Sequence, residues 1–160
     1  MPNLYFNDLA QRKILMHARR RMAKLTFLLG LCGSGKTYIA EQLATQTGAE
    51  LFSDFLQDQS KNLPLLLKNL SSGIDCIIDE WKYSIPRFRD KILVDLVNVP
   101  NLQVEWICFE NDRANADWNV VHRTNKADAE GHLRINEFLS DVYQYPAQAQ
   151  ILKITRIDAG

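Results

Sequence analysis

The sequence has no excess of charge of either sign: 19 lysine and arginine residues balance 19 aspartate and glutamate residues. Proteins that bind a long stretch of nucleic acid usually carry a basic excess, because neutralising phosphates and releasing counterions drives their binding. The balance therefore argues against an extended nucleic-acid surface. It leaves room for a small basic pocket that holds one end of a strand.

Long apolar runs are also missing. No stretch approaches the roughly 18 or more uncharged apolar residues of a membrane span, and Asp8, Arg12 and Lys13 interrupt the N-terminal segment where a signal peptide would lie. We therefore predict a cytoplasmic protein with no membrane contact. Because no repeat and no long linker divides the chain, we predict one domain over residues 1–160, with residues 1–23 as an N-terminal helical extension.

Cysteine is scarce, with Cys32, Cys76 and Cys108 the only three. Each lies in or beside an apolar run and no two are close in sequence, which indicates reduced, mostly buried thiols. A structural metal site needs clustered ligands, and the sequence shows no such cluster.

What is present is an alternation of short apolar runs and amphipathic segments. Short apolar runs predict strands at residues 25–29, 74–78 and 102–109, with a weaker strand at residues 50–53, and apolar–polar alternation predicts an edge-like strand at residues 151–157. Between them, helical spacing predicts helices at residues 37–47, 63–70, 84–96, 114–121 and 135–142. Alternating strands and helices predict a mainly parallel α/β sheet that is covered on both faces.

The clearest motif is at residues 30–37, GLCGSGKT, which match the Walker A pattern G-x-x-x-x-G-K-[ST] at every fixed position. This segment, called the P-loop below, follows a predicted buried strand and opens a predicted helix, as the motif requires. Its glycines let successive N–H groups point at phosphates, and the helix N-terminus adds partial positive charge. The residues predicted to bind a nucleoside triphosphate are Gly30, Gly33, Ser34, Gly35, Lys36 and Thr37.

Two of these residues have distinct predicted roles: Lys36 reaches the β- and γ-phosphates, and the Thr37 hydroxyl coordinates Mg²⁺. A second acid site follows the strand at residues 74–78, where Asp79 fits the Walker B carboxylate that holds the Mg²⁺ directly or through water. The next residue, Glu80, is open to two interpretations. It either polarises a water, as in many hydrolysing ATPases, or is a solvated loop residue.

With these motifs in this order, residues 25–157 resemble the small P-loop kinases that include polynucleotide 5′-kinase and the zeta-toxin type. The resemblance implies a three-layer P-loop NTPase fold of about five mainly parallel strands in the order 2-3-1-4-5, with an arginine-bearing lid. It implies transfer of the γ-phosphate of ATP, with Mg²⁺, to an acceptor hydroxyl. A nucleotide or a nucleic-acid 5′-end is the favoured acceptor, and a small sugar-like molecule stays open.

In that family an aspartate at the end of the second strand accepts the proton of the acceptor hydroxyl, and Asp54 occupies that place here. The chemistry supports this role independently, because ligands of parallel sheets sit at the carboxyl ends of the strands and an ionised carboxylate there suits a general base. Alternatively, Asp54 caps the following turn together with Ser53. Asp58 is the second candidate for the base. Unlike similar kinases, the chain has no arginine closely following Asp54.

The resemblance also implies roles for arginines. In the lid segment after the fourth strand, Arg123 is the first candidate and Arg113 the second to stabilise the charge of the transition state. The alternative is a surface helix with solvated arginines. Arg87 and Arg89 are candidates to bind a phosphate of the acceptor, or else to form surface ion pairs with acidic neighbours.

Competing functions remain at this stage. A P-loop ATPase coupled to a partner would use Glu80 to activate water, and a nucleotide-binding regulatory module would do no chemistry. GTPase activity is disfavoured: the N-K-x-D-like residues 125–128 follow a predicted helix and not a buried strand. The oligomeric state is left open.

Overall fold

The computed structural model describes residues 22–158. Of the N-terminal helical extension predicted for residues 1–23, residues 1–21 therefore lie outside the described part. None of the helices within residues 22–158 is long and apolar enough to cross a membrane.

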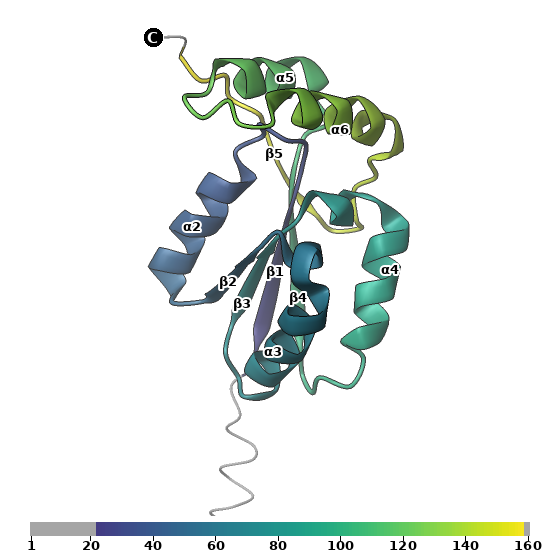
Figure 1. Ribbon diagram of the computed structural model, residues 1–160. Coiled ribbons are helices and arrows are strands. Elements are labelled where there is room, and N and C mark those ends of the chain that lie inside the picture. The colour runs from purple at the N-terminus through teal and green to yellow at the C-terminus, as the bar shows by residue number, and fades with distance from the viewer. Residues whose placement is uncertain (1–21, 159–160) are drawn as a thin grey trace, which may run out of the picture.

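A parallel β-sheet forms the centre of the protein (Figure 1). Its five strands are β1 (Lys24–Leu29), β2 (Glu50–Ser53), β3 (Cys76–Asp79), β4 (Gln103–Phe109) and β5 (Gln150–Leu152). They lie in the order β2-β3-β1-β4-β5, and every neighbouring pair is parallel. The predicted strand order is confirmed, and with it a topology that brings the carboxyl ends of β1, β2 and β3 to one edge.

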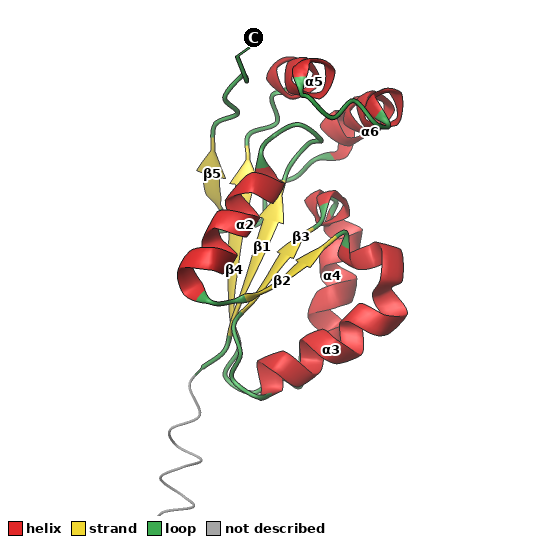
Figure 2. Ribbon diagram, turned by 60° about the vertical axis from the view of Figure 1, so that its left-hand side comes forward, coloured by secondary structure: helices red, strands yellow, loops and turns green. Residues whose placement is uncertain are grey.

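Helices cover both faces of this sheet (Figure 2). They are α2 (Lys36–Thr47), α3 (Gln59–Ser71), α4 (Pro86–Asp95), α5 (Arg113–His122) and α6 (Ala129–Val142), with short 3₁₀ turns η1 (Phe55–Asp58) and η2 (Trp81–Ser84). Helices α3 and α4 lie on one face and α2 on the other, while α5 and α6 lie side by side over the carboxyl end of the sheet. The helical pair thus lies beside the loops that leave the strands.

The side chains of β1 alternate between two hydrophobic clusters, one on each face of the sheet. Leu25 and Phe27 pack with residues of α3 and α4, whereas Leu28 packs against Ala40 of α2 and residues of α5 and α6. Tyr83 is buried and meets Phe27 edge to face, with ring centroids 5.2 Å apart. All three cysteines are free and buried, as predicted.

The last strand is shorter than its apolar–polar alternation predicts, ending at Leu152 and not near Ile157. Its partner β4 ends at Phe109, so the chain beyond Leu152 has no neighbouring strand to pair with. The Ile154 N–H instead donates to Oε1 of Glu110 over 3.0 Å. Apolar–polar alternation in the sequence indicates which residues face the core, whereas the length of a strand also depends on where its neighbouring strand ends.

Candidate active site

The P-loop joins β1 to α2, and two of its glycines adopt left-handed backbone conformations, with φ of 83° at Gly33 and 99° at Gly35. A Cβ at Gly33 would overlap the backbone carbonyl oxygen of Ala116 on α5. Any side chain at Gly33 would therefore push α5 away from the loop as well as strain the backbone. The curl that the motif predicts is present, and it depends on the close approach of α5.

Thr37 and Asp79 come together across the sheet, as the two motifs predict. The Thr37 hydroxyl donates to Oδ2 of Asp79 over 2.7 Å. Asp79 is buried, and burial raises the pKa of its carboxyl group, which the Lys36 charge and the Thr37 hydrogen bond only partly oppose. The Lys36 ammonium donates to the Leu31 carbonyl oxygen over 3.2 Å, which folds the side chain back onto the loop.

The prediction that Glu80 is a solvated loop residue is wrong. The side chain is buried, with Oε2 accepting from the Leu56 N–H over 3.1 Å and Oε1 from the Lys82 N–H over 3.2 Å. Burial raises the pKa of this carboxyl group, and the backbone donors oppose the rise. Because both oxygens are engaged by backbone, Glu80 ties the end of β3 to η1 and η2.

Asp54 lies exposed at the end of β2, next to the end of β3. Its backbone has a φ of 51°, and its N–H donates to the Asp79 carbonyl oxygen over 3.0 Å. The side chain makes no capping hydrogen bond to η1, so the alternative role as a cap has no contact to support it. Its charge adds to burial in raising the pKa values of Asp79 and Glu80 and opposes the lowering of the His132 pKa, which places the carboxylate within electrostatic reach of α6 as well.

The two candidate arginines of the lid segment end up in different places. Arg123 follows α5 and lines a cavity together with Lys36 and Thr37. Its Nε is buried without a hydrogen-bond partner. Arg113 is exposed at the start of α5, where its Nε pairs with Asp117 over 3.2 Å, and it does not line this cavity. The structure thus brings Arg123, but not Arg113, to the P-loop.

The two arginines predicted to bind the acceptor, Arg87 and Arg89, lie in different environments. Arg89 is 7% exposed, and its Nη1 donates to the Tyr83 carbonyl oxygen over 2.6 Å. Burial lowers the pKa of this guanidinium. Arg89 is thus built into the packing between η2 and α4, which speaks against an acceptor contact and against a surface ion pair. Arg87 is exposed, and its guanidinium lies 5.0 Å from the centre of the Phe88 ring.

Two buried asparagines, one on each of α5 and α6, attach these helices to the P-loop. Asn136 of α6 accepts from the Cys32 N–H over 2.7 Å and donates to the Cys32 carbonyl oxygen over 2.9 Å. Asn119 of α5 donates to the carbonyl oxygens of Gly33 and Thr155, each over 2.9 Å. Asn136 and Cys32 are 104 residues apart in sequence, so no local motif links them. The one signal in the sequence is that a polar asparagine lies on an otherwise apolar helix face.

Asn136→Ala tests this attachment. Removing the amide leaves the Cys32 N–H, the Cys32 carbonyl and Asp117 without their buried partner. Since each unsatisfied buried group costs about 1–3 kcal/mol, we expect the free energy of unfolding to fall by about 2–4 kcal/mol. We also expect weaker nucleotide binding, because the Cys32 peptide is free to turn.

Urea unfolding and nucleotide titration calorimetry measure the two effects of Asn136→Ala. Glu137→Ala, at an exposed neighbour on the same helix, is the control and should change neither quantity. Equal stability of the two variants would show that the Asn136 hydrogen bonds do not hold the loop.

The cavity beside the P-loop has a volume of about 720 Å³. The P-loop and the start of α2 form one wall, and Asn119, Arg123 and the segment after β5 form the other. This second wall includes the side chains of Leu152, Thr155 and Ile157. An open, largely apolar cavity that ends at a phosphate-binding loop is typical of a nucleotide site.

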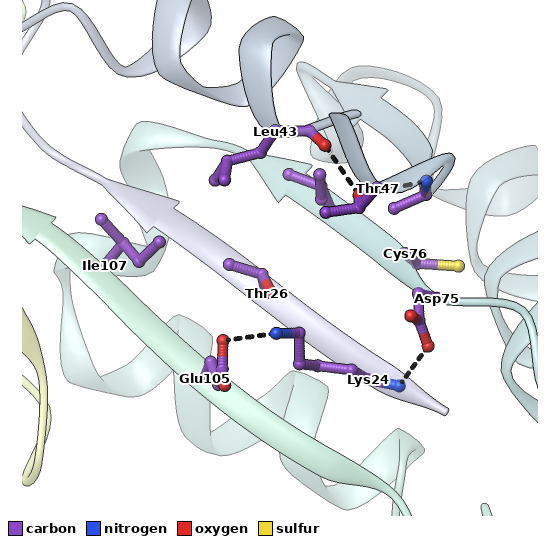
Figure 3. A pocket seen from close by; sticks show the side chains of 10 residues that line it. Lys24, Thr26, Leu43, Thr47, Asp75, Cys76, Glu105 and Ile107 are labelled. Atoms are coloured by element: carbon purple, nitrogen blue, oxygen red, sulfur yellow. Dashed lines mark hydrogen bonds and ion pairs between the residues drawn. The ribbon is translucent and has the colours of Figure 1, made fainter. Parts of the chain in front are cut away.

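A second cavity, of about 330 Å³, lies at the amino-terminal half of the sheet, away from the P-loop (Figure 3). The Lys24 ammonium pairs there with Oε2 of Glu105 over 3.1 Å, and the Lys24 N–H donates to Oδ1 of Asp75 over 2.9 Å. The Thr47 hydroxyl donates to the Leu43 carbonyl oxygen. Because the polar groups that line this cavity are paired with neighbouring protein groups, we interpret it as a gap between packed elements and not as the catalytic centre.

A parallel sheet in the order 2-3-1-4-5 with a glycine loop between β1 and α2 defines a P-loop kinase-like fold. No protein-family model matches the sequence, and no curated protein shows significant sequence similarity to it. The likeness to known proteins is therefore one of structure.

Three solved structures illustrate this likeness. A gluconokinase from Sinorhizobium meliloti 1021 has a TM-score of 0.60 at 14% identity, covering 86% of each chain. A sugar kinase from Janibacter sp. HTCC2649 has a TM-score of 0.57 at 16% identity, covering 82% of this chain and 86% of that one. A structure of the PezAT chromosomal toxin–antitoxin system of Streptococcus pneumoniae has a TM-score of 0.50 at 16% identity, with coverages of 96% and 79%. At such identities the likeness shows the fold, and the polynucleotide 5′-kinase and zeta-toxin subgroup stays a prediction.

Proposed function

We propose that the protein is a phosphotransferase that moves the γ-phosphate of ATP, with Mg²⁺, to an acceptor hydroxyl. The single observation that carries the proposal is the convergence of four features at the carboxyl end of one sheet. They are the curled P-loop, the Thr37–Asp79 pair, the carboxylate of Asp54 and the guanidinium of Arg123. Together they supply the parts that phosphoryl transfer needs: phosphate binding, metal ligands, a base and charge stabilisation.

The nucleotide would lie along the 720 Å³ cavity with its triphosphate on the P-loop. The backbone N–H groups of the loop and the N-terminus of α2 would bind the phosphates. The ammonium of Lys36 would then exchange its contact with the Leu31 carbonyl for the β- and γ-phosphate oxygens. The apolar wall of the cavity suits the flat face of a nucleobase.

The donor set at Thr37 and Asp79 fits a magnesium ion. A hydroxyl and a carboxylate oxygen lie 2.7 Å apart, and the buried carboxylate has no cationic partner within ion-pair distance among the described residues. Oxygen ligands of this kind, completed by phosphate oxygens, are what Mg²⁺ prefers. A bound Mg²⁺ would supply Lewis-acid stabilisation of the charge on the phosphates.

In the chemical step, we assign the role of general base to Asp54. Its carboxylate accepts the proton of the acceptor hydroxyl while the acceptor oxygen forms its bond to the γ-phosphorus. The bond between the γ-phosphorus and the bridging oxygen breaks, and ADP leaves. Arg123 donates to the equatorial oxygens of the transferred group, where negative charge accumulates. The exposure of Asp54 leaves room for an acceptor to approach.

A nucleotide or a nucleic-acid 5′-end is the acceptor we favour, from the sequence resemblance. Arg87 is the remaining candidate for an acceptor contact, since Arg89 is buried. A small sugar-like acceptor is the second possibility, favoured by the structural likeness to a gluconokinase and a sugar kinase. The ATPase hypothesis loses support, because the backbone contacts of Glu80 occupy both of its oxygens.

Transfer of labelled γ-phosphate from ATP tests the proposed function. The acceptor panel holds nucleosides, nucleotides, 5′-hydroxyl oligonucleotides, sugars and sugar acids, each with and without Mg²⁺. We expect one class to become labelled, and Lys36→Ala to abolish the labelling. ATP binding in calorimetry without transfer to any acceptor and without release of phosphate would favour a nucleotide-binding module instead.

Asp79→Asn separates the cost of burying a carboxylate from its use as a ligand. Because burial raises the pKa of Asp79 above its ordinary value of 3.8, the folded protein binds this proton more tightly than the unfolded chain. Ionised Asp79 thus costs stability, and this cost appears as the pH rises from 3.8 through the folded pKa. At pH 7 the nucleotide-free variant should melt at the same temperature as the parent or about 2–4 °C higher.

The same variant should lose at least about 10-fold in Mg²⁺-dependent ATP affinity, because an amide is a weaker magnesium ligand than a carboxylate. Thermal melts with and without Mg²⁺ and ATP measure both effects. A large drop in the melting temperature without nucleotide would mean that ionised Asp79 stabilises the fold, contrary to this expectation.

A further inference from the structure

We propose that His132 is a positioning residue that holds the guanidinium of Arg123 beside the P-loop through its ring nitrogen Nδ1. The inference rests on the proposed function, since it concerns the arginine that stabilises the transferred phosphate. In the sequence, His132 shares no metal-ligand spacing with His17 or His122, which by itself predicts a surface residue.

The contact itself defines the protonation state of the histidine. Nη2 of Arg123 lies within hydrogen-bond distance of Nδ1 of His132, and it also donates to the Ala127 carbonyl oxygen over 3.4 Å. A guanidinium nitrogen can only donate, so Nδ1 must accept, and the ring must be neutral with its proton on Nε2. Protonation of His132 removes the acceptor and places two positive charges in contact.

The helix that carries His132 is fixed to the P-loop. Asn136 lies four residues further along α6, on the same face of the helix, and its amide holds both the N–H and the carbonyl of Cys32. His132 therefore faces the P-loop from a helix that is attached to it. A histidine on a mobile surface loop could not define the position of an arginine in this way.

Arg123 keeps a free donor while His132 holds it. The Nε of Arg123 is buried and has no hydrogen-bond partner, and the side chain lines the cavity that includes Lys36 and Thr37. One edge of the guanidinium is thus fixed to α6, and a further N–H can bind an anionic ligand. Holding a long side chain before the ligand arrives lowers the entropy that is lost on reaching the transition state.

Burial, together with the charges around His132, lowers the pKa of the ring and favours its neutral form. Burial lowers its pKa from 6.5, Arg123 at the end of α5 and Lys36 of α2 lower it further, and Asp128 before α6 and Asp54 after β2 raise it. The net direction is downward. As the pH falls through this lowered pKa, His132 becomes charged and Arg123 loses its acceptor, so the rate of transfer should fall.

Steady-state kinetics across pH 5–8 with the acceptor found by label transfer test the proposal. His132→Ala should lower kcat at pH 7.5 by about 10- to 100-fold, because Arg123 is misplaced, with the KM for ATP changed by less than about 3-fold. His132→Asn keeps an acceptor near the position of Nδ1 but cannot become charged. This variant should retain kcat within about 3-fold at pH 7.5. Its kcat should also fall less than that of the parent as the pH is lowered, because the asparagine does not become protonated.

Two controls separate positioning from general damage. His122→Asn changes the other described histidine, which stacks on Trp118 with ring centroids 3.7 Å apart, and it should leave the pH profile unchanged. In the double variant Arg123→Ala/His132→Ala, kcat should equal that of Arg123→Ala alone, because His132 acts only through Arg123. Additive losses would overturn the proposal.

A readout that does not depend on activity keeps the two proposals distinguishable. In NMR titrations of the full chain, the pKa of His132 should lie below 6.5 and should rise when Arg123 is replaced by glutamine. If the parent protein transfers no phosphate but this pKa responds to Arg123, the proposed function fails and the contact stands. If the parent transfers phosphate and His132→Ala leaves kcat unchanged, the positioning role is refuted.

Discussion

Arg123→Ala is expected to lower the rate of phosphoryl transfer by roughly 10³- to 10⁵-fold, the range found when an arginine that contacts the transferred group is removed. The structure provides the physical reason. Arg123 lines the cavity beside the P-loop, and its Nη2 lies within hydrogen-bond distance of His132. Its buried Nε has no hydrogen-bond partner. Charge on the equatorial oxygens of the transferred phosphate would meet this donor in a partly dehydrated site.

The affinity for ATP should change far less than the rate, because the contact strengthens only as charge develops in the transition state. Single-turnover measurements with saturating ATP separate the two quantities. Arg123→Lys should recover little of the rate, since a point charge on a flexible stem does not reproduce the fork of the guanidinium.

Arg113→Ala is the matched control for this experiment. Both residues belong to the segment in which the sequence resemblance expects lid arginines, but Arg113 is exposed and pairs with Asp117. Because Arg113 does not line the cavity beside the P-loop, Arg113→Ala should leave the rate nearly unchanged, and loss of its partly exposed ion pair should cost only about 0.3–0.5 kcal/mol of stability. A larger loss of rate in Arg113→Ala than in Arg123→Ala would reverse our assignment of the two arginines.

Asp54→Asn should lower transfer by about 10²- to 10⁴-fold, the usual contribution of a positioned general base, with ATP affinity unchanged within about 3-fold. The amide keeps the size and the hydrogen-bonding capacity of the side chain but cannot accept the proton of the hydroxyl. Because the Asp54 side chain makes no capping bond and the residue is exposed, the fold should tolerate the change. Retained stability in thermal melts is therefore part of the expected result.

Asp58→Asn decides between the two carboxylates that follow β2. Asp58 precedes α3, and its Oδ1 lies 3.4 Å from the Ser60 hydroxyl, an ordinary surface contact. We expect Asp58→Asn to transfer phosphate at the parent rate. Full turnover in Asp54→Asn together with loss in Asp58→Asn would move the base to Asp58, and full turnover in both would mean that neither carboxylate is the base.

The fold was predictable because its signals are local. The inner strands are short apolar runs, β5 lies in a segment of apolar–polar alternation, each helix repeats apolar residues at helical spacing, and the P-loop motif lies between β1 and α2. The strand order came from the family resemblance and is confirmed. The boundaries were less accurate where a partner decides them, as at β5, which ends at Leu152 because β4 ends at Phe109.

Pairings across the site were predictable only where a motif specifies them. Thr37 and Asp79 meet as expected, since Thr37 begins the helix that the P-loop joins to β1 and Asp79 ends β3, the parallel neighbour of β1. The solvated position considered for Glu80 and the surface ion pair considered for Arg89 were wrong, because charged side chains usually face solvent and these two are buried against backbone partners. Nothing in the neighbouring residues indicates such burial.

By itself the sequence determined the sheet, the P-loop and the acid at the end of β3, because periodicity and glycine spacing are properties of consecutive residues. Only the tertiary structure decided that Arg123 and not Arg113 lines the cavity beside the P-loop, that Asn119 and Asn136 hold the P-loop, and that His132 contacts Arg123. The asparagine contacts join residues 86 and 104 positions apart in sequence, and the contact between Arg123 and His132, nine positions apart, depends on how the end of α5 meets α6. Contacts of that kind depend on the three-dimensional packing of the chain and leave no repeating signal along it.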